Sequence, residues 1–183
     1  MNLDMFCFQC EQTAHGSGCT KKGVCGKDPD TAAMQDLLIY ATKGLSQVAH
    51  AARQEGIVNN AADRFVCEGT FSTLTNVNFD PERFQEYVNK AVEHRERLKK
   101  RIKEAGEQNA SLLEKAKRAI GLSEGGSEVE FPEGPATFQP ASTLEGMVEQ
   151  GKEHGVLQDP EQNEDIKSLK EALVYGIKGV AAY

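Results

Sequence analysis

Residues 30–52 read DTAAMQDLLIYATKGLSQVAHAA, and their pattern of apolar side chains decides the fold. The apolar positions recur at the i, i+3, i+4 and i+7 spacing of one helix face. They are Met34, Leu37, Leu38, Ala41, Leu45, Val48, Ala49 and Ala52. Asp30 or Thr31 can cap the start of this helix, and Gly56 ends it. The stretch therefore predicts an amphipathic helix of about six turns.

Two further helices are expected at short distances along the chain. The first covers residues 61–74 and precedes a polar turn at residues 76–78. Its inward side chains are Phe65, Val66 and Leu74. The second starts with Asp80 as N-cap and Pro81 at the first helical position. Its predicted buried face consists of Phe84, Tyr87, Val88, Ala91, Leu98 and Ile102. Three helices joined by short loops predict a bundle.

The composition changes after this bundle. Gly106 is expected to break or kink the third helix, which a shorter helix over residues 110–120 then continues. Residues 121–142 are rich in Gly, Ser, Glu and Pro, which indicates a linker or a long surface loop. A further helix is expected over residues 143–154, and a last one from about Asp165. The fold class is therefore mainly α, with a loop at 1–30, a first helical bundle at 31–120, a linker at 121–142 and the start of a second bundle at 143–183.

An internal repeat supports the second bundle. When residues 30–48 are moved along by 135 positions, they align with residues 165–183. Leu38, Tyr40, Lys43 and Gly44 then coincide with Leu173, Tyr175, Lys178 and Gly179. This match is consistent with a duplicated bundle. Helix-stop signals are missing at Tyr183, so we expect the chain to be part of a longer protein.

Charge and hydropathy exclude several classes of protein. The net charge is −7, whereas a protein that binds nucleic acid through phosphates needs a basic surface. The richest basic stretch, residues 94–103, is interrupted by Glu96 and is interpreted as a solvated helix face. The sequence has neither an apolar run long enough to span a membrane nor a secretory signal at its start. We therefore expect a cytoplasmic protein with reduced thiols.

Four cysteines lie within the first 30 residues, where no periodic apolar stripe exists. They are Cys7, Cys10, Cys19 and Cys25, with gaps of two, eight and five residues. So long a stretch without regular structure is uncommon in a compact domain unless something else organises it. A metal centre can do so, because ligand bonds replace the missing core.

Four thiolates suit either Zn²⁺ or an iron–sulfur cluster. Structural zinc modules usually have a second close pair of ligands, which the two wide gaps do not form. Wide, uneven gaps can instead wrap around a cubane cluster. Glycines in the loop allow backbone N–H groups to turn toward sulfur, and Lys21, Lys22 and Lys27 can offset the negative charge of the thiolates. The residues alone favour a cluster, while a structural zinc module that binds a partner protein and cysteines that bind no metal stay open.

Several segments of the chain together resemble the N-terminal part of the hybrid-cluster proteins, also called prismane proteins or hydroxylamine reductases. The segments are MFCFQCEQTA at 5–14, GCT at 18–20, GVCGK at 23–27, Leu37-Leu38, FSTLTNVNFD at 71–80 and YGIKGVAAY at 175–183. The resemblance covers nearly the whole chain and is weakest at residues 121–140.

The resemblance implies an N-terminal domain of two three-helix bundles that carries a [4Fe-4S] cluster on Cys7, Cys10, Cys19 and Cys25. Some family members have wider cysteine spacing and a [2Fe-2S] cluster. It also implies an electron relay: an electron-donor protein feeds this cluster, which passes electrons to a catalytic hybrid iron–sulfur–oxygen cluster in two later domains. The family reaction is reduction of hydroxylamine, and nitric oxide reduction is a related proposal.

The ligands of the hybrid cluster are not found in this sequence. After Cys25 it offers Cys67, which is interpreted as a buried small hydrophobe, and His50, His94 and His154, which do not cluster with acidic residues. We therefore expect this chain alone to be non-catalytic. A free-standing electron carrier of ferredoxin type is a third interpretation, but a carrier needs no helical bundles.

Overall fold

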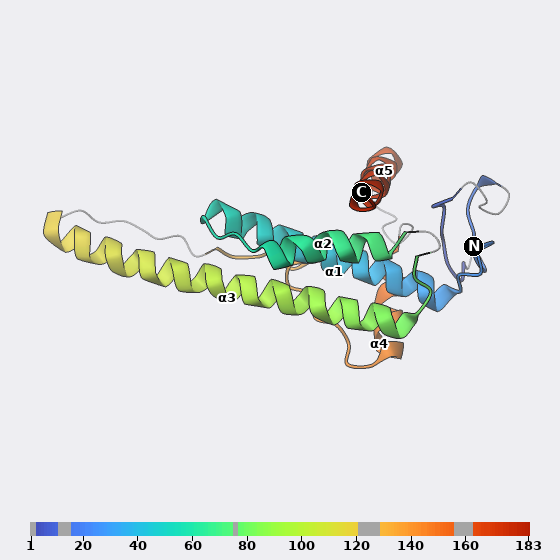
Figure 1. Cartoon of the computed structure of the whole chain (residues 1–183), viewed down its shortest axis with the longest axis horizontal. Coiled ribbons are helices and arrows are strands. Elements are labelled where there is room, and N and C mark those ends of the chain that lie inside the picture. The colour runs from blue at the N-terminus through green and yellow to red at the C-terminus, as the bar shows by residue number, and fades with distance from the viewer. Residues whose placement is uncertain (1–2, 11–15, 75–76, 121–128, 156–162) are drawn as a thin grey trace.

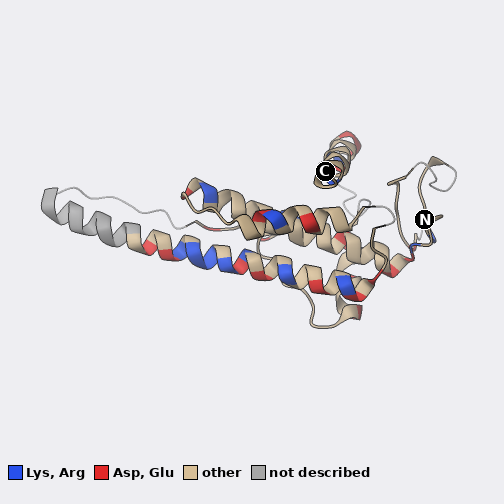
Figure 2. Ribbon diagram, in the orientation of Figure 1, with Lys and Arg blue, Asp and Glu red and all other residues tan. Residues whose placement is uncertain are grey.

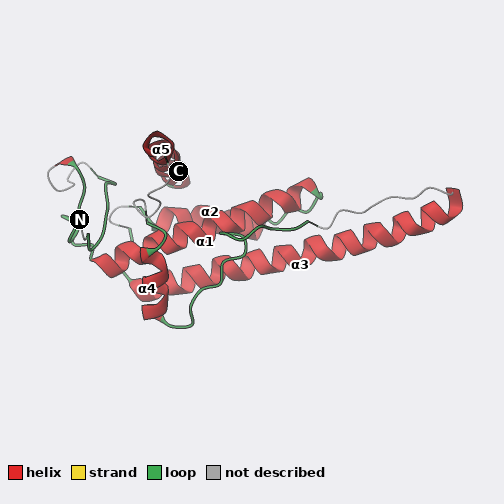
Figure 3. Ribbon diagram, turned by 180° about the vertical axis from the view of Figure 1, so that it is seen from behind, coloured by secondary structure: helices red, strands yellow, loops and turns green. Residues whose placement is uncertain are grey.

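The computed structural model describes residues 3–10, 16–74, 77–120, 129–155 and 163–183, without side chains for 109–120. These residues form five helices: α1 (Pro29–Gln54), α2 (Asn60–Ser72), α3 (Pro81–Ile120), α4 (Leu144–Lys152) and α5 (Glu164–Ala181). Figure 3 shows helices and loops but no strand among the described residues, and the one β-type pairing there is an isolated bridge. The mainly α class is confirmed. Residues 11–14 of the family resemblance, Asn76 of the expected turn and residues 121–128 of the expected linker lie outside the described residues.

The helix α1 forms where the apolar pattern predicts it. The N-cap is Asp28 rather than Asp30 or Thr31, because its carboxylate accepts a hydrogen bond from Thr31 N at 2.7 Å and Pro29 occupies the first turn. At the other end Gly56 has a positive φ of 72°. Its N–H and that of Ile57 donate back to the last turn, which is a Schellman cap.

The core lies around α1, which packs against α2, α3 and α4. All eight apolar positions predicted on α1 are buried: Met34, Leu37, Leu38, Ala41, Leu45, Val48, Ala49 and Ala52. On α3, Phe84, Val88, Ala91, Leu98 and Ile102 are buried as predicted, while Tyr87 is partly buried. Met147 and Val148 of α4 belong to the same core. A single apolar core therefore unites the first four helices.

The helix α3 runs unbroken for 40 residues, so the expected break at Gly106 is wrong. Nothing lies within 4 Å of a Cβ built on Gly106, and the helix there extends past the other helices (Figure 1). A lone glycine weakens an exposed helix by about 1 kcal/mol, which is too little to stop it.

The ribbon in Figure 2 is coloured at the Lys, Arg, Asp and Glu positions along α3. One basic residue of the stretch 94–103 does not lie on a solvated helix face. Arg95 is fully buried. Its guanidinium donates to Pro135 O at 3.0 Å and to Phe138 O at 2.6 Å, and it also pairs with Glu96. The described part of the expected linker therefore packs against α3 through Arg95. The division of the chain into domains stays a prediction.

At two glycines, Gly44 and Gly151, another segment of backbone packs directly against a helix because no Cβ is present. A Cβ on Gly44 of α1 would lie 2.0 Å from Pro135 O, and one on Gly151 of α4 would lie 2.1 Å from Ala33 O. These contacts place Pro135 against the middle of α1 and α4 against its N-terminal part.

Replacing Gly44 by alanine is expected to destabilise the protein by about 2 kcal/mol, because overpacking outweighs the gain in helix propensity. Gly106→Ala is the matched control on an open helix face, where alanine is expected to stabilise by about 0.5–1 kcal/mol. Urea unfolding followed by circular dichroism measures both. Equal stabilisation by the two variants would contradict the close packing at Gly44.

The helix α5 packs mainly against α2 and presents its apolar side chains outward. Ile166, Leu169, Leu173, Ile177 and Val180 share one face, and each is at least 47% exposed. Lys178, on another side of the helix, is buried.

None of the helices that the structure describes combines the length and the apolar character of a membrane-spanning helix.

Candidate metal centre

The backbone of the N-terminal arm pairs two of the four predicted ligands. Cys7 N donates to Cys19 O at 3.0 Å, and Cys19 N donates to Cys7 O at 2.8 Å. This reciprocal pair is the hydrogen-bonded type of antiparallel bridge, in which facing Cα atoms lie about 5.5 Å apart. Gly18, with φ of 139°, permits the approach: a Cβ there would lie 2.6 Å from the Phe6 ring. Cys7 and Cys19 therefore stand side by side.

Cys25 sits in a tight turn formed by residues 23–27. Gly23 N donates to Lys27 O at 2.7 Å, and Gly26 N donates to Gly23 O at 2.9 Å. Gly26 has a positive φ of 97°, which a residue with a Cβ rarely adopts. Cys25 is exposed, whereas Cys10 is partly buried and lies three residues beyond Cys7. Gly18 and Gly26 thus shape the loops next to Cys19 and Cys25.

Lys27 connects the cysteine arm to α1. It is only 2% exposed, and its ammonium nitrogen lies 2.5 Å from Gln35 Oε1 and 3.5 Å from Cys7 Sγ. Lys21 and Lys22, by contrast, are exposed. Of the three lysines expected to offset thiolate charge, Lys27 is the one in contact with a cysteine sulfur.

The donor set fits a cluster held by thiolates. None of the four arm cysteines forms a disulfide with another described residue, and thiolate sulfur is a ligand that both iron–sulfur clusters and zinc prefer. Within the described residues, however, no three His, Cys, Asp or Glu side chains are already gathered around one point.

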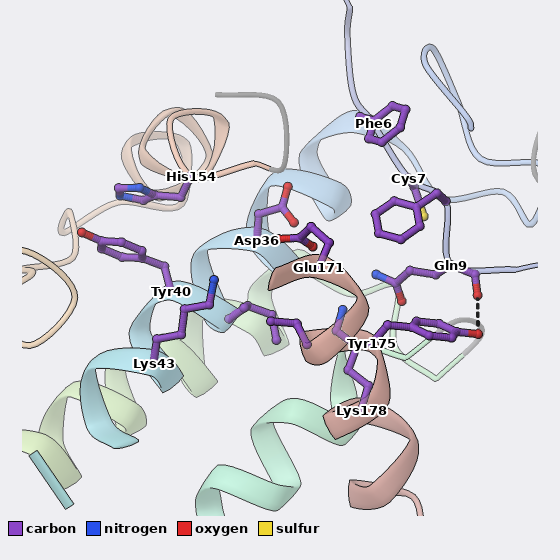
Figure 4. A pocket seen from close by; sticks show the side chains of 13 residues that line it. Phe6, Cys7, Gln9, Asp36, Tyr40, Lys43, His154, Glu171, Tyr175 and Lys178 are labelled. Carbon is purple, nitrogen blue, oxygen red and sulfur yellow. Dashed lines mark hydrogen bonds between the residues drawn. The ribbon is translucent and has the colours of Figure 1, made fainter. Parts of the chain in front are cut away.

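A pocket lies between the cysteine arm, α1 and α5 (Figure 4). The side chains from α1 are Asp36, Ile39, Tyr40 and Lys43, and those from α5 are Glu171, Val174, Tyr175 and Lys178. Each α5 residue lies 135 positions after its α1 counterpart, so the internal repeat places the same four kinds of side chain on two walls. Cys7, Phe6 and Gln9 line the side formed by the arm.

Polar contacts fix α5 to the arm at this pocket. The Tyr175 hydroxyl donates to Gln9 O at 3.3 Å, the dashed contact in Figure 4. With its amide oriented to satisfy its neighbours, Gln9 also donates to Thr73 O at 3.1 Å and accepts from Lys178 Nζ at 2.9 Å. Through Gln9, the arm therefore contacts both α5 and the end of α2.

Burial in the pocket changes the protonation of two charged groups. Loss of solvent raises the pKa of Asp36 from 3.8 to about 7, although Lys178 and Lys27 oppose the rise. Loss of solvent likewise lowers the pKa of Lys178 from 10.5 to about 8, against the attraction of Asp36. The neutral forms of both groups are thus favoured more than in water.

These shifts predict a pH dependence of stability. Because Asp36 binds a proton more tightly when folded, its contribution weakens as pH rises from about 4 to about 7. Asp36→Asn, which imitates the protonated acid, is expected to gain stability relative to the native chain over the same range. Melting temperatures of both proteins between about pH 5 and pH 8 measure the difference. A gap that stays constant with pH would contradict the raised pKa of the partly buried Asp36.

Several predictions about other residues require correction or extension. Cys67 is exposed, so its interpretation as a buried hydrophobe is wrong. The register of α2 explains this, because Ala62, Phe65 and Gly69 form its inward face and Cys67 lies about 200° around the helix from Phe65.

His154 stacks on Tyr40 at a centroid distance of 3.6 Å. The residues missed by the sequence analysis are Asp36 and Glu171, although their match at the 135-residue offset could have revealed them.

Fold and site together define a helical domain with an N-terminal thiol-rich arm suited to a metal centre. The model of the Prismane/CO dehydrogenase family matches residues 5–183 of this chain. The chain therefore belongs to the Prismane/CO dehydrogenase family.

Named relatives agree with this family. The chain is 48% identical over 179 residues to a hydroxylamine reductase of Syntrophobacter fumaroxidans and 49% identical over 180 residues to one of Methanocella arvoryzae. A hydroxylamine reductase of Clostridium tetani is 40% identical over 187 residues. These matches cover 98–99% of this chain but only 29–32% of each relative. The chain thus spans about a third of their length.

Proposed function

We propose that this chain is the N-terminal electron-transfer domain of a hydroxylamine reductase of the hybrid-cluster type. The observation that carries the proposal is the arm with four cysteines outside disulfides, Cys7, Cys10, Cys19 and Cys25. The chain is also 48–49% identical to two proteins named hydroxylamine reductase. The arm would hold a [4Fe-4S] cluster through these thiolates; a [2Fe-2S] cluster or zinc fits the spacing less well.

The arm's residues would position and shield such a centre. The four cysteines would occupy all the protein ligand positions of a cubane, and the cluster would supply one-electron transfer without an open position for substrate. Phe6 and Phe8, with ring centroids 5.9 Å apart, limit the access of water from one side. The buried Lys27 supplies positive charge at Cys7. The chain's own part would therefore be to bind the cluster, to shield it from water and to offset its negative charge.

The partners in this proposal are the remaining domains of the same enzyme and an electron-donor protein. Support comes from the apolar face of α5, where Leu173 is 65% and Val180 is 76% exposed. Their counterparts at the 135-residue offset, Leu38 and Leu45, are fully buried in α1. Helices of a second bundle would cover α5 as α2 and α3 cover α1. The whole enzyme would act in the cytoplasm, without contact to nucleic acid or membrane.

A redox experiment tests the proposal. The chain is loaded with iron and sulfide under anaerobic conditions and titrated with dithionite while its visible spectrum is followed. We expect broad absorption that bleaches on reduction and returns with a one-electron oxidant, and no hydroxylamine turnover by the loaded chain alone. A colourless protein that binds zinc and stays folded would instead support the alternative, a structural zinc module that binds a partner protein.

A further inference from the structure

Lys27 is a buried cation whose surroundings call for a negative partner. Its side chain is almost inaccessible, and none of the ion pairs among the described residues involves it. The nearby carboxyl of Asp36 feels its charge, but burial raises the pKa of that group and favours its neutral form. Burying an ammonium group costs free energy unless a negative group lies close. The sulfur of Cys7, 3.5 Å from the ammonium nitrogen, becomes such a group when it is a thiolate.

Both the side chain and the backbone of Lys27 are held by hydrogen bonds. Gln35 of α1 donates through Nε2 to Asn78 O at 3.3 Å, which leaves Oε1 to accept from Lys27 Nζ at 2.5 Å. On the arm, the Lys27 carbonyl accepts from Gly23 N and closes the turn that carries Cys25. One residue therefore links Cys7, the turn of Cys25 and the first helix.

We propose that Lys27, held in place by Gln35, is the positioning residue that supplies the counter-charge of the cysteine-bound centre and raises its reduction potential. This inference rests on the proposed function, since it requires a redox centre on the arm. Reduction adds one negative charge to the centre. A fixed cation at low local dielectric stabilises that charge more than an exposed lysine does.

The test compares two lysines of the same arm. Lys27→Met removes the buried charge with little change in side-chain length, and Lys22→Met removes an exposed one as the matched control. Midpoint potentials are measured by spectroscopic titration of the anaerobically loaded chains. We expect Lys27→Met to disfavour the reduced form at least tenfold, a fall of 59 mV for a one-electron couple. Lys22→Met should shift the equilibrium by a much smaller factor.

Two further variants separate the effect of the charge at residue 27 from the effect of its position. Lys27→Arg keeps the charge and is expected to restore most of the native potential. Gln35→Leu leaves the arm sequence intact and frees the ammonium, so it should lower the potential in the same direction even if Lys27→Met does not load. Equal potentials for Lys27→Met and Lys22→Met, an unchanged potential in Gln35→Leu, or an equally low one in Lys27→Arg would each overturn the proposal. Absence of a redox-active centre from the native chain would instead refute the proposed function.

Discussion

Replacing Cys19 by serine is expected to remove most of the iron that the chain binds. Cys19 is 4% exposed, and its backbone pairs with Cys7, so serine preserves the shape and hydrogen bonds of the bridge. What is lost is the thiolate, the form in which cysteine binds metal. Groups that only support a ligand typically contribute about tenfold or more to metal affinity. Loss of a direct ligand should cost at least as much affinity. We therefore expect the iron bound per chain after anaerobic loading to fall to a small fraction of the native value.

Cys67→Ser is the matched control for this prediction. Cys67 is an exposed thiol on α2, outside the arm. Its replacement should leave iron content and the visible spectrum as in the native chain. Similar iron content in both serine variants would show that the arm does not hold the metal through Cys19.

Replacing Arg95 by methionine is expected to destabilise the fold by about 3 kcal/mol. The change removes two charged hydrogen bonds and leaves the carbonyls of Pro135 and Phe138 without their buried donor. Methionine retains much of the apolar stem, so the loss measures the hydrogen bonds more than the packing. Urea unfolding followed by circular dichroism reports the free energy of unfolding.

Arg97→Met serves as the comparison on the same helix. Arg97 is exposed and pairs with Glu93 one turn away, and surface pairs of this kind contribute about 0.3–0.5 kcal/mol. If both variants lost the same small amount, Arg95 would not anchor residues 135–138 to α3. The comparison therefore contrasts buried hydrogen bonds to the backbone with an exposed ion pair on the same helix.

Much of the helical fold could be predicted because its signals are local. The apolar periodicity of α1 and the Asp80-Pro81 start of α3 each follow from residues within a few positions. Gly106 was misleading because glycine lowers helix stability without forbidding a helix. The burial of Arg95 depends on carbonyls about 40 residues away, and no local pattern in α3 indicates them.

The candidate site likewise has features that the local sequence predicts and features that depend on distant parts of the chain. Cysteine spacing and the nearby glycines identify the arm from its own sequence. The selection of Lys27 over Lys21 and Lys22 requires Gln35 on another element, which the sequence of the arm does not contain. The pocket at Asp36 and Lys178 arises because two repeated helices face each other, a relation visible only once both are placed.

The most direct test of the central claim is analysis of iron, acid-labile sulfide and zinc in anaerobically purified protein. A cubane on the four arm cysteines predicts about four iron and four sulfide per chain, with negligible zinc. About one zinc per chain with no sulfide would contradict an electron relay.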